Sequence, residues 1–260
     1  MKIEMNGINL HYSEAGGGEH ALVFLHFWGG SSFEWTEVIQ GLSSEYRCIA
    51  PDARGSGASD APESGYRISD LADDVQGIIA ALKLKSFVVV GHSMGGKTAQ
   101  VLAARRPVGL KGIALVASAP ASPMQIDQAR RDQMKGAYSS AESVNWAIDN
   151  VLSGSPIPEA SRNQLVADAL RLSPSGLNGW VDVGALEDYS KEVADVNVPV
   201  AVIAGEDDRV DPPEVVRERI LAAFASPETH FLAKRGHLLP LEAPSELVRI
   251  LKSFAKRAFA

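Results

Sequence analysis

Ser93 is the residue of this chain whose surroundings most clearly indicate chemistry. It lies in the run Gly91–Gly95 (Gly-His-Ser-Met-Gly), directly after the apolar stretch Phe87–Val90. The Gly-x-Ser-x-Gly spacing is typical of a sharp strand-to-helix turn, in which the serine backbone is strained and small flanking residues let strand and helix pass closely. A serine at such a turn faces free helix N–H groups that can stabilise an oxyanion. The pattern predicts a nucleophile, with a glycine-rich turn carrying a serine helix cap as the alternative.

A serine hydroxyl needs a base that takes its proton and a third group that holds the base. Both partners are expected on loops after later strands, with the carboxylate before the histidine. An acidic turn follows the predicted strand Val198–Ala204, and His237 follows the predicted strand Glu228–Leu232. The candidate carboxylates are Glu206, Asp207, Asp208 and Asp211. The alternative for these residues is a solvated acidic turn, which is expected for at least two of those that do not hold the base.

The elements that position these residues alternate between apolar runs of strand length and longer helical stretches. This alternation is typical of a doubly wound α/β fold, a mainly parallel sheet with helices on both faces. The expected strands are Lys2–Leu10 and Leu10–Glu14 as an opening hairpin, Ala21–His26, Arg47–Pro51, Phe87–Val90, Leu110–Ala117, Val198–Ala204 and Glu228–Leu232. The expected helices are Phe33–Ser43, Ile68–Leu82 with Ser69 as its cap, Lys97–Ala104, Pro213–Phe224 and Glu246–Ala258.

The segment from about residue 121 to 188 contains no convincing strand. Its apolar periodicity predicts four helical pieces, over Met124–Tyr138, Ala141–Leu152, Pro158–Leu172 and Leu177–Tyr189. Because this interruption lies between two core strands, we expect residues 121–188 to form a helical cap inserted into a core made of residues 1–120 and 189–260. Helices that pack around the edge of the sheet are the alternative.

The composition narrows the partners of the protein. The chain has 260 residues, 45% of them hydrophobic and 22% charged, with a net charge of −7, which argues against nucleic acid and anionic membranes as partners. The single cysteine, Cys48, is expected to pack in the core. No signal peptide or membrane span is recognisable, so a cytoplasmic location is predicted. Neither a cofactor motif nor a metal-ligand spacing occurs, and no oligomeric state is predicted.

With these motifs in this order, the chain resembles the α/β-hydrolase-fold proteins over essentially its whole length. Two further segments carry the resemblance: the Asp-x-Arg-Gly-x-Gly-x-Ser loop at Asp52–Ser59, and the Gly-His followed by Glu-x-Pro at Gly236–Pro244. The resemblance implies that Ser93 is the nucleophile and His237 the base. The family's fixed offset after the strand-ending glycine implies that Asp208 is the acid.

The resemblance also implies an oxyanion hole made of the backbone N–H groups of Met94 and Trp28. Trp28 occupies the donor position of the family's His-Gly-x-Gly or His-Gly-x-Pro loop, here residues 26–29. Phe27 replaces the usual glycine, so the loop needs a conformation that a side chain allows at this position. The histidines expected to serve the scaffold through hydrogen bonds or packing are His26 and His92.

Together these implications predict a serine hydrolase that cleaves a small or medium carboxylic ester or lactone without a cofactor. Apolar residues of the cap are expected to line the pocket or, alternatively, to form the core of the cap. These residues are Met124, Tyr138, Trp146, Leu152 and Trp180.

Other members of the fold give the alternatives. Carbon–carbon bond hydrolases share the triad but bind acidic substrates, for which the cap offers only Arg130, Arg131, Arg162 and Arg171. Cofactor-free haloperoxidases and perhydrolases often have proline where this chain has Gly29. Haloalkane dehalogenases and epoxide hydrolases place aspartate at the elbow, so Ser93 argues against them. A small-molecule receptor that keeps the triad is the alternative outside enzymes.

Overall fold

The computed structural model describes all 260 residues of the chain. An eight-stranded sheet in the order β1-β2-β4-β3-β5-β6-β7-β8 forms its centre. The pairs β1–β2 and β2–β4 are antiparallel, and every other pair is parallel. The strands are β1 (Lys2–Met5), β2 (Ile8–Ala15), β3 (Ala21–Leu25), β4 (Arg47–Pro51), β5 (Phe87–His92), β6 (Leu110–Val116), β7 (Val200–Gly205) and β8 (Glu228–Leu232). The predicted α/β fold is confirmed.

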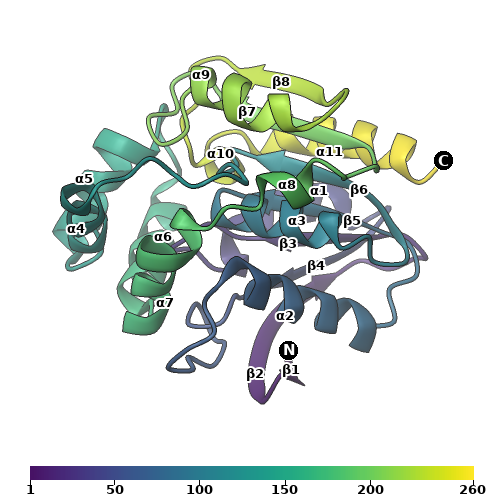
Figure 1. Cartoon of the computed structure of the whole chain (residues 1–260), viewed down its shortest axis with the longest axis horizontal. Helices are drawn as coiled ribbons and strands as arrows, with labels where there is room; N and C mark the ends of the chain where they lie inside the picture. Colours follow the sequence, from purple (N-terminus) through teal and green to yellow (C-terminus); the bar gives the residue numbers. More distant parts are fainter.

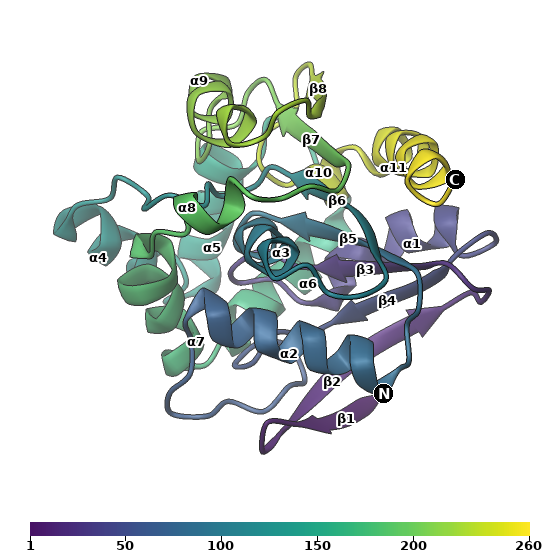
Figure 2. The ribbon, with the colours of Figure 1, turned by 45° about the vertical axis from the view of Figure 1, so that its right-hand side comes forward.

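Helices cover both faces of this sheet. Helices α2 (Ile68–Ala81) and α3 (Met94–Ala104) pack on one face, and α1 (Thr36–Leu42) and α11 (Pro244–Ala258) pack on the other (Figure 2). Because both faces are covered, the central strands β3 and β5 are buried along their whole length. Cys48 is fully buried in this core, as predicted.

The sheet brings distant parts of the chain to one edge. Ser93, Asp208 and His237 follow β5, β7 and β8, which run parallel to one another. Carboxyl ends of parallel strands meet at the same edge, where open α/β sheets bind their ligands.

The connection between β6 and β7, residues 117–199, is called the insertion below. Its helices gather on the side of the molecule away from the C-terminus (Figure 1). They are α4 (Gln128–Gly136), α5 (Ala141–Ala147) with a π-helical turn (Ile148–Leu152), α6 (Glu159–Arg171), α7 (Pro174–Asn178) with a π-helical turn (Gly179–Val183) and a 3₁₀ turn (Gly184–Leu186), and α8 (Ser190–Val193). The insertion contains no strand. The boundaries 121 and 188 of a cap stay a prediction.

The expected helix over Leu177–Tyr189 is confirmed as far as residue 186 and is wrong for its last three residues. Helical turns run from residue 174 to 186, and the last three residues of the expected helix are extended or irregular. The N–H of Met124 donates to the carbonyl of Ala185 at 2.7 Å, and the N–H of Tyr189 donates to Ala121 at 3.0 Å. The segment that leads from the insertion back to β7 therefore pairs with the segment that leads from β6 into the insertion. This long-range pairing replaces the local helical hydrogen bonds.

The expected cap of α2 is also wrong: the helix begins at Ile68, as predicted, but its N-cap residue is Arg67 and not Ser69. Ser69 lies inside α2, and the Asp70 carboxylate accepts the N–H of Arg67 at 2.9 Å. The remaining helical pieces are a 3₁₀ turn (Ser32–Trp35), α9 (Pro213–Val215) with a π-helical turn (Val216–Ile220) and a 3₁₀ turn (Leu221–Ala223), and α10 (Leu239–Glu242). No helix has both the length and the hydrophobicity to cross a membrane.

Candidate active site

Ser93 forms a strained turn between β5 and α3. Its backbone lies at φ +51° and ψ −113°, a conformation that costs a non-glycine residue about 1–3 kcal/mol. The flanking glycines are both required. A Cβ at Gly91 would lie 2.3 Å from the Gly95 carbonyl oxygen, and a Cβ at Gly95 would lie 2.4 Å from the carbonyl oxygen of Leu25. The strand, the helix and β3 therefore cross without room for side chains.

His237 and Asp208 form a buried pair beside this turn. His237 Nδ1 lies 2.8 Å from Asp208 Oδ2, and the two residues are 1% and 3% exposed. The second oxygen of Asp208 accepts the N–H groups of Val210 at 2.8 Å and Asp211 at 3.1 Å. With both carboxylate oxygens bonded, Asp208 holds His237 with Nε2 left for another partner.

None of the other candidate carboxylates hydrogen-bonds to His237. Glu206 and Asp207 are exposed on the turn. Asp211 is buried, and its Oδ2 has no hydrogen-bond partner. Burial raises the pKa of Asp211 to about 7, and the charge of Asp208 adds to the rise.

The pKa of His237 reflects two opposing effects. Burial lowers this pKa, whereas the Asp208 carboxylate raises it through its charge and its hydrogen bond. The result lies above the ordinary value of 6.5. Ser93 and His237 line the same cavity, although no hydrogen bond joins them. Such contacts are often long in structures without substrate and tighten in the complex.

Two backbone N–H groups close to Ser93 have no acceptor within the chain: Met94 follows Ser93 directly, and Trp28 lines the same cavity as Ser93. Met94 is the first residue of α3, so its N–H has no acceptor within the helix. The N–H of Trp28 belongs to a peptide whose carbonyl, on Phe27, accepts His26 Nδ1–H at 2.7 Å and the N–H of Gly30 at 3.1 Å. These bonds fix the orientation of the peptide, and neither the Trp28 nor the Met94 N–H donates within the chain.

The replacement of glycine by Phe27 does not strain this loop. Positive φ occurs at Gly29, at +90°, and not at Phe27. A Cβ at Gly29 would lie 2.4 Å from the ring of Tyr138, which comes from the insertion. The Tyr138 hydroxyl donates to the carbonyl of Trp28 at 3.0 Å, and the two rings pack against each other with centroids 4.4 Å apart and planes tilted by 33°.

The insertion also contacts the base. The backbone N–H of His237 donates to the carbonyl of Leu152 at 2.7 Å. On α3, the buried Lys97 donates to carbonyls of both connections of the insertion, Glu187 at 2.7 Å and Ser122 at 3.4 Å. The insertion is thus bonded to the oxyanion loop, to the base and to the helix that follows Ser93.

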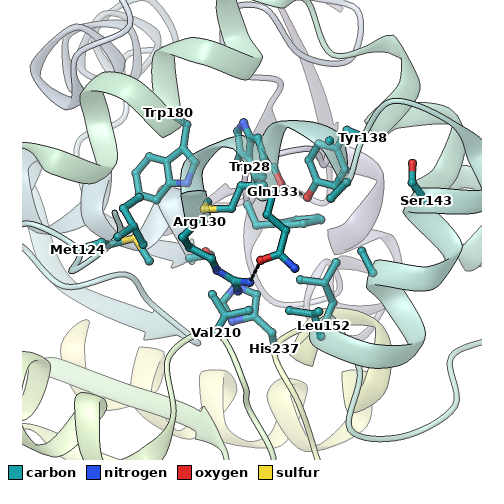
Figure 3. Close-up of a pocket in the computed structure, with 18 of the residues that line it drawn as sticks. Trp28, Met124, Arg130, Gln133, Tyr138, Ser143, Leu152, Trp180, Val210 and His237 are labelled. Atoms are coloured by element: carbon teal, nitrogen blue, oxygen red, sulfur yellow. Dashed lines mark hydrogen bonds between the residues drawn. The ribbon is translucent and has the colours of Figure 1, made fainter. Parts of the chain in front are cut away.

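A cavity of about 330 Å³ lies between the insertion and the sheet edge. Its wall is mainly apolar, and Figure 3 shows the side chains of the insertion converging on it from several helices. All five apolar residues expected at a pocket line it: Met124, Tyr138, Trp146, Leu152 and Trp180. Residues of the wall that the sequence did not suggest include Gln133, Met134 and Val151.

Of the four cap arginines, only Arg130 lines the cavity. It hydrogen-bonds Gln133 Oε1 at 2.7 Å and has no carboxylate partner, and Figure 3 shows this pair on the cavity wall. Each of the other three arginines pairs with an aspartate: Arg131 with Asp182, Arg162 with Asp149, and Arg171 with Asp168.

A buried polar chain that the sequence did not predict lies behind His237. His92 Nε2 is 2.8 Å from the His237 carbonyl oxygen, and His92 Nδ1 is 3.0 Å from Glu34 Oε1. His26, by comparison, accepts the N–H of Ala53 at 2.9 Å. Both histidines thus serve the scaffold, as expected. Glu34 carries no motif that could have singled it out.

The comparisons with known proteins agree with this architecture. A family model described as alpha/beta hydrolase fold matches residues 20–143, which include Ser93 but neither Asp208 nor His237. The soluble epoxide hydrolase of Corynebacterium sp. (strain C12) is 40% identical over 95 residues, which are 36% of this chain and 33% of that protein. The match thus spans about a third of that relative's length.

Other similarities extend over nearly the whole chain. The 3-oxoadipate enol-lactonase 2 of Acinetobacter baylyi is 27% identical over 257 residues, 96% of this chain and 94% of that one. The solved structure of an esterase from Exiguobacterium antarcticum has a TM-score of 0.87 at 22% identity and covers 98% of both chains. The fold, the turn at Ser93 and these similarities lead to one assignment: the chain has the α/β-hydrolase fold.

Proposed function

We propose that the protein is a serine hydrolase that cleaves a small or medium carboxylic ester or lactone. The observation that carries this proposal is the 2.8 Å bond between Asp208 and His237 on the cavity that also contains the strained Ser93. A nucleophile, a base and a group that orients the base are the minimum for acyl transfer to serine.

In the proposed reaction, His237 Nε2 takes the proton of Ser93 as Oγ attacks the carbonyl carbon. Asp208 keeps Nδ1 protonated and stabilises the imidazolium. The N–H groups of Trp28 and Met94 hold the oxyanion. His237 then returns the proton to the leaving alcohol, and a water molecule activated by His237 releases the acid from the acyl-serine.

The cavity supports an uncharged or weakly polar acyl group. At about 330 Å³ and with a mainly apolar wall, it lies at the small end of ordinary ligand pockets. Similar proteins carry the names esterase and enol-lactonase, which agree with an ester or lactone substrate. Ser93 at the elbow supports these substrates over an epoxide.

The first test is hydrolysis of p-nitrophenyl esters from acetate to decanoate by the wild type and by Ser93→Ala. We expect kcat to fall by about 10⁴-fold or more in the variant, as in other serine hydrolases that lose their nucleophile. Ser226→Ala, at an exposed serine before β8, is the matched control and should match the wild type. A fluorophosphonate probe should label the wild type and the control but not Ser93→Ala. Turnover that survives in Ser93→Ala would disprove the proposal.

Arg130 supports a second, more specific version of this proposal. In this version, the acyl part of the substrate ends in a carboxylate. It is the only lysine or arginine on the cavity wall, and no carboxylate of the chain neutralises it. Planar guanidinium groups bind carboxylates through paired hydrogen bonds.

Two p-nitrophenyl esters of equal acyl length, one ending in a methyl group and one in a carboxylate, test this version. Arg130→Gln should lower kcat/KM for the carboxylate ester by about 10-fold, the value of a lost charged hydrogen bond, and leave the neutral ester unchanged. Arg171→Gln, at an exposed arginine already paired with Asp168, is the control. An equal effect of Arg130→Gln on both esters would show that Arg130 does not bind the carboxylate of the substrate.

A further inference from the structure

The main chain of His237 is held by the residue that precedes Ser93. His92 Nε2 lies 2.8 Å from the His237 carbonyl oxygen, which also accepts the N–H of Leu239 at 2.9 Å. His92 is fully buried, and its ring lies 5.2 Å from the ring of His237. Because His92 and Ser93 are neighbours in the chain, one side-chain bond sets the position of the base relative to the nucleophile.

The partners of His92 determine its protons. A carbonyl oxygen only accepts, so Nε2 must carry a hydrogen. If His92 is neutral, Nδ1 then has a lone pair, and Glu34 Oε1 at 3.0 Å must donate to it. Glu34 would therefore be a neutral carboxylic acid. An imidazolium–carboxylate pair would satisfy the same two bonds.

Burial favours the neutral pair. His92 and Glu34 are 0% and 4% exposed, and placing two charges there carries a desolvation cost that their attraction does not reliably repay. Burial lowers the pKa of His92 to about 3 and raises that of Glu34 to about 8. The titratable groups that influence Glu34 are His26, His237 and Asp168.

The second oxygen of Glu34 points to the same state. Oε2 is buried and has no hydrogen-bond partner of normal geometry; the backbone N–H of Phe27 lowers the pKa of Glu34 but does not outweigh burial. A carbonyl oxygen of a neutral acid tolerates this better than an oxygen of a carboxylate, whose lone pairs demand several donors. The site is also closely packed, since a Cβ at Gly30 would lie 2.7 Å from this oxygen.

We propose that Glu34 acts as a positioning residue: as a neutral acid it donates to His92 Nδ1, fixes the Nε2–H tautomer of His92, and thereby holds the His237 backbone in register with Ser93. This inference rests on the proposed function, in which His237 is the base. It places the support of the base on two sides, with Asp208 bonded to the imidazole and His92 bonded to the main chain.

Two substitutions of Glu34 distinguish a role as a neutral hydrogen-bond donor from a role as a negative charge. Glu34→Gln keeps an N–H donor of similar shape for Nδ1, so its kcat should stay within about threefold of the wild type. Glu34→Met removes the donor and should lower kcat by about 10- to 100-fold with KM nearly unchanged, because binding groups stay in place. Glu37→Met, at an exposed glutamate on α1, is the matched control.

The pH profile adds a readout that a purely structural role would not move. Ionisation of Glu34 near pH 8 removes its donor, so wild-type kcat/KM should decline above that pH, and this decline should be absent in Glu34→Gln. If Glu34→Gln is as slow as Glu34→Met, Glu34 acts as a charge and the proposal fails. If Glu34→Met has wild-type kcat, the buried pair of Glu34 and His92 does not position His237, and the proposal fails.

Nitrogen-15 NMR of labelled histidines tests the tautomer without an activity assay. At neutral pH, His92 should give the neutral Nε2–H signature in the wild type and in Glu34→Gln. An imidazolium signature overturns the proposal, and this measurement holds even if Glu34→Met does not fold. Failure of the proposed function would show separately, as turnover that survives Ser93→Ala.

Discussion

At the scale of single residues, the ionisation of His237 should set the acid limb of activity. The base must be neutral, and its pKa lies above 6.5 because the charge and hydrogen bond of Asp208, together with the charges of Asp211 and Glu242, outweigh burial. We therefore expect kcat/KM of an uncharged ester to rise with pH through that raised pKa and to be low below pH 6. A profile that stays flat down to about pH 4, far below ordinary histidine values, would contradict a histidine base.

Asp208→Asn serves as the companion variant for this profile. It removes the charge that raises the pKa of His237, so the residual acid limb should move to lower pH. It also frees the imidazole to adopt the wrong tautomer, so kcat should drop by about 10⁴-fold. Asp207→Asn, on the exposed part of the same turn, should leave both the acid limb and kcat unchanged.

At the scale of elements, Tyr138 connects the end of α4 to the loop that carries Trp28. Tyr138→Phe keeps the ring that packs against Trp28 and removes only the 3.0 Å bond to the Trp28 carbonyl. A neutral hydrogen bond contributes about 0.5–1.5 kcal/mol, so kcat should fall by about 2- to 10-fold.

The measurement for Tyr138→Phe is kcat and KM on the best p-nitrophenyl ester, with thermal unfolding in parallel. Ser139→Ala, at the exposed residue next along the chain, controls for a general effect of changing this segment. A rise in KM at constant kcat would mean that Tyr138 contributes to the cavity wall but not to the oxyanion loop.

At the scale of the whole molecule, the fold could be predicted because its signals are local and repeated. Runs such as Ala21–Leu25 and Phe87–Val90 are buried on both faces, so they are apolar throughout and stand out in the sequence. The predicted strand Glu228–Leu232 agrees with β8 at both ends. The Gly-x-Ser-x-Gly turn was predictable because steric crowding leaves only glycine at its flanks.

What could not be predicted depends on contacts between distant residues. The end of the helical turns near residue 186 follows from pairing with residues 121–124, more than 60 positions away. Glu34 and His92 are 58 positions apart, and neither belongs to a spaced pattern that indicates their bond. The choice of Arg130 among four arginines likewise depends on which carboxylates the fold brings to the others.

The insertion is bonded to both halves of the proposed catalytic apparatus, through Tyr138 to the oxyanion loop and through Leu152 to the main chain of His237. Lifting it away from the sheet would therefore withdraw support from the oxyanion donor and from the base together. The conformation that encloses the substrate is then also the one in which the oxyanion donor and His237 are fully supported. An acyl compound too long to be enclosed would hold the insertion open and meet a serine without its full support, so selection by size would act on turnover rather than on binding.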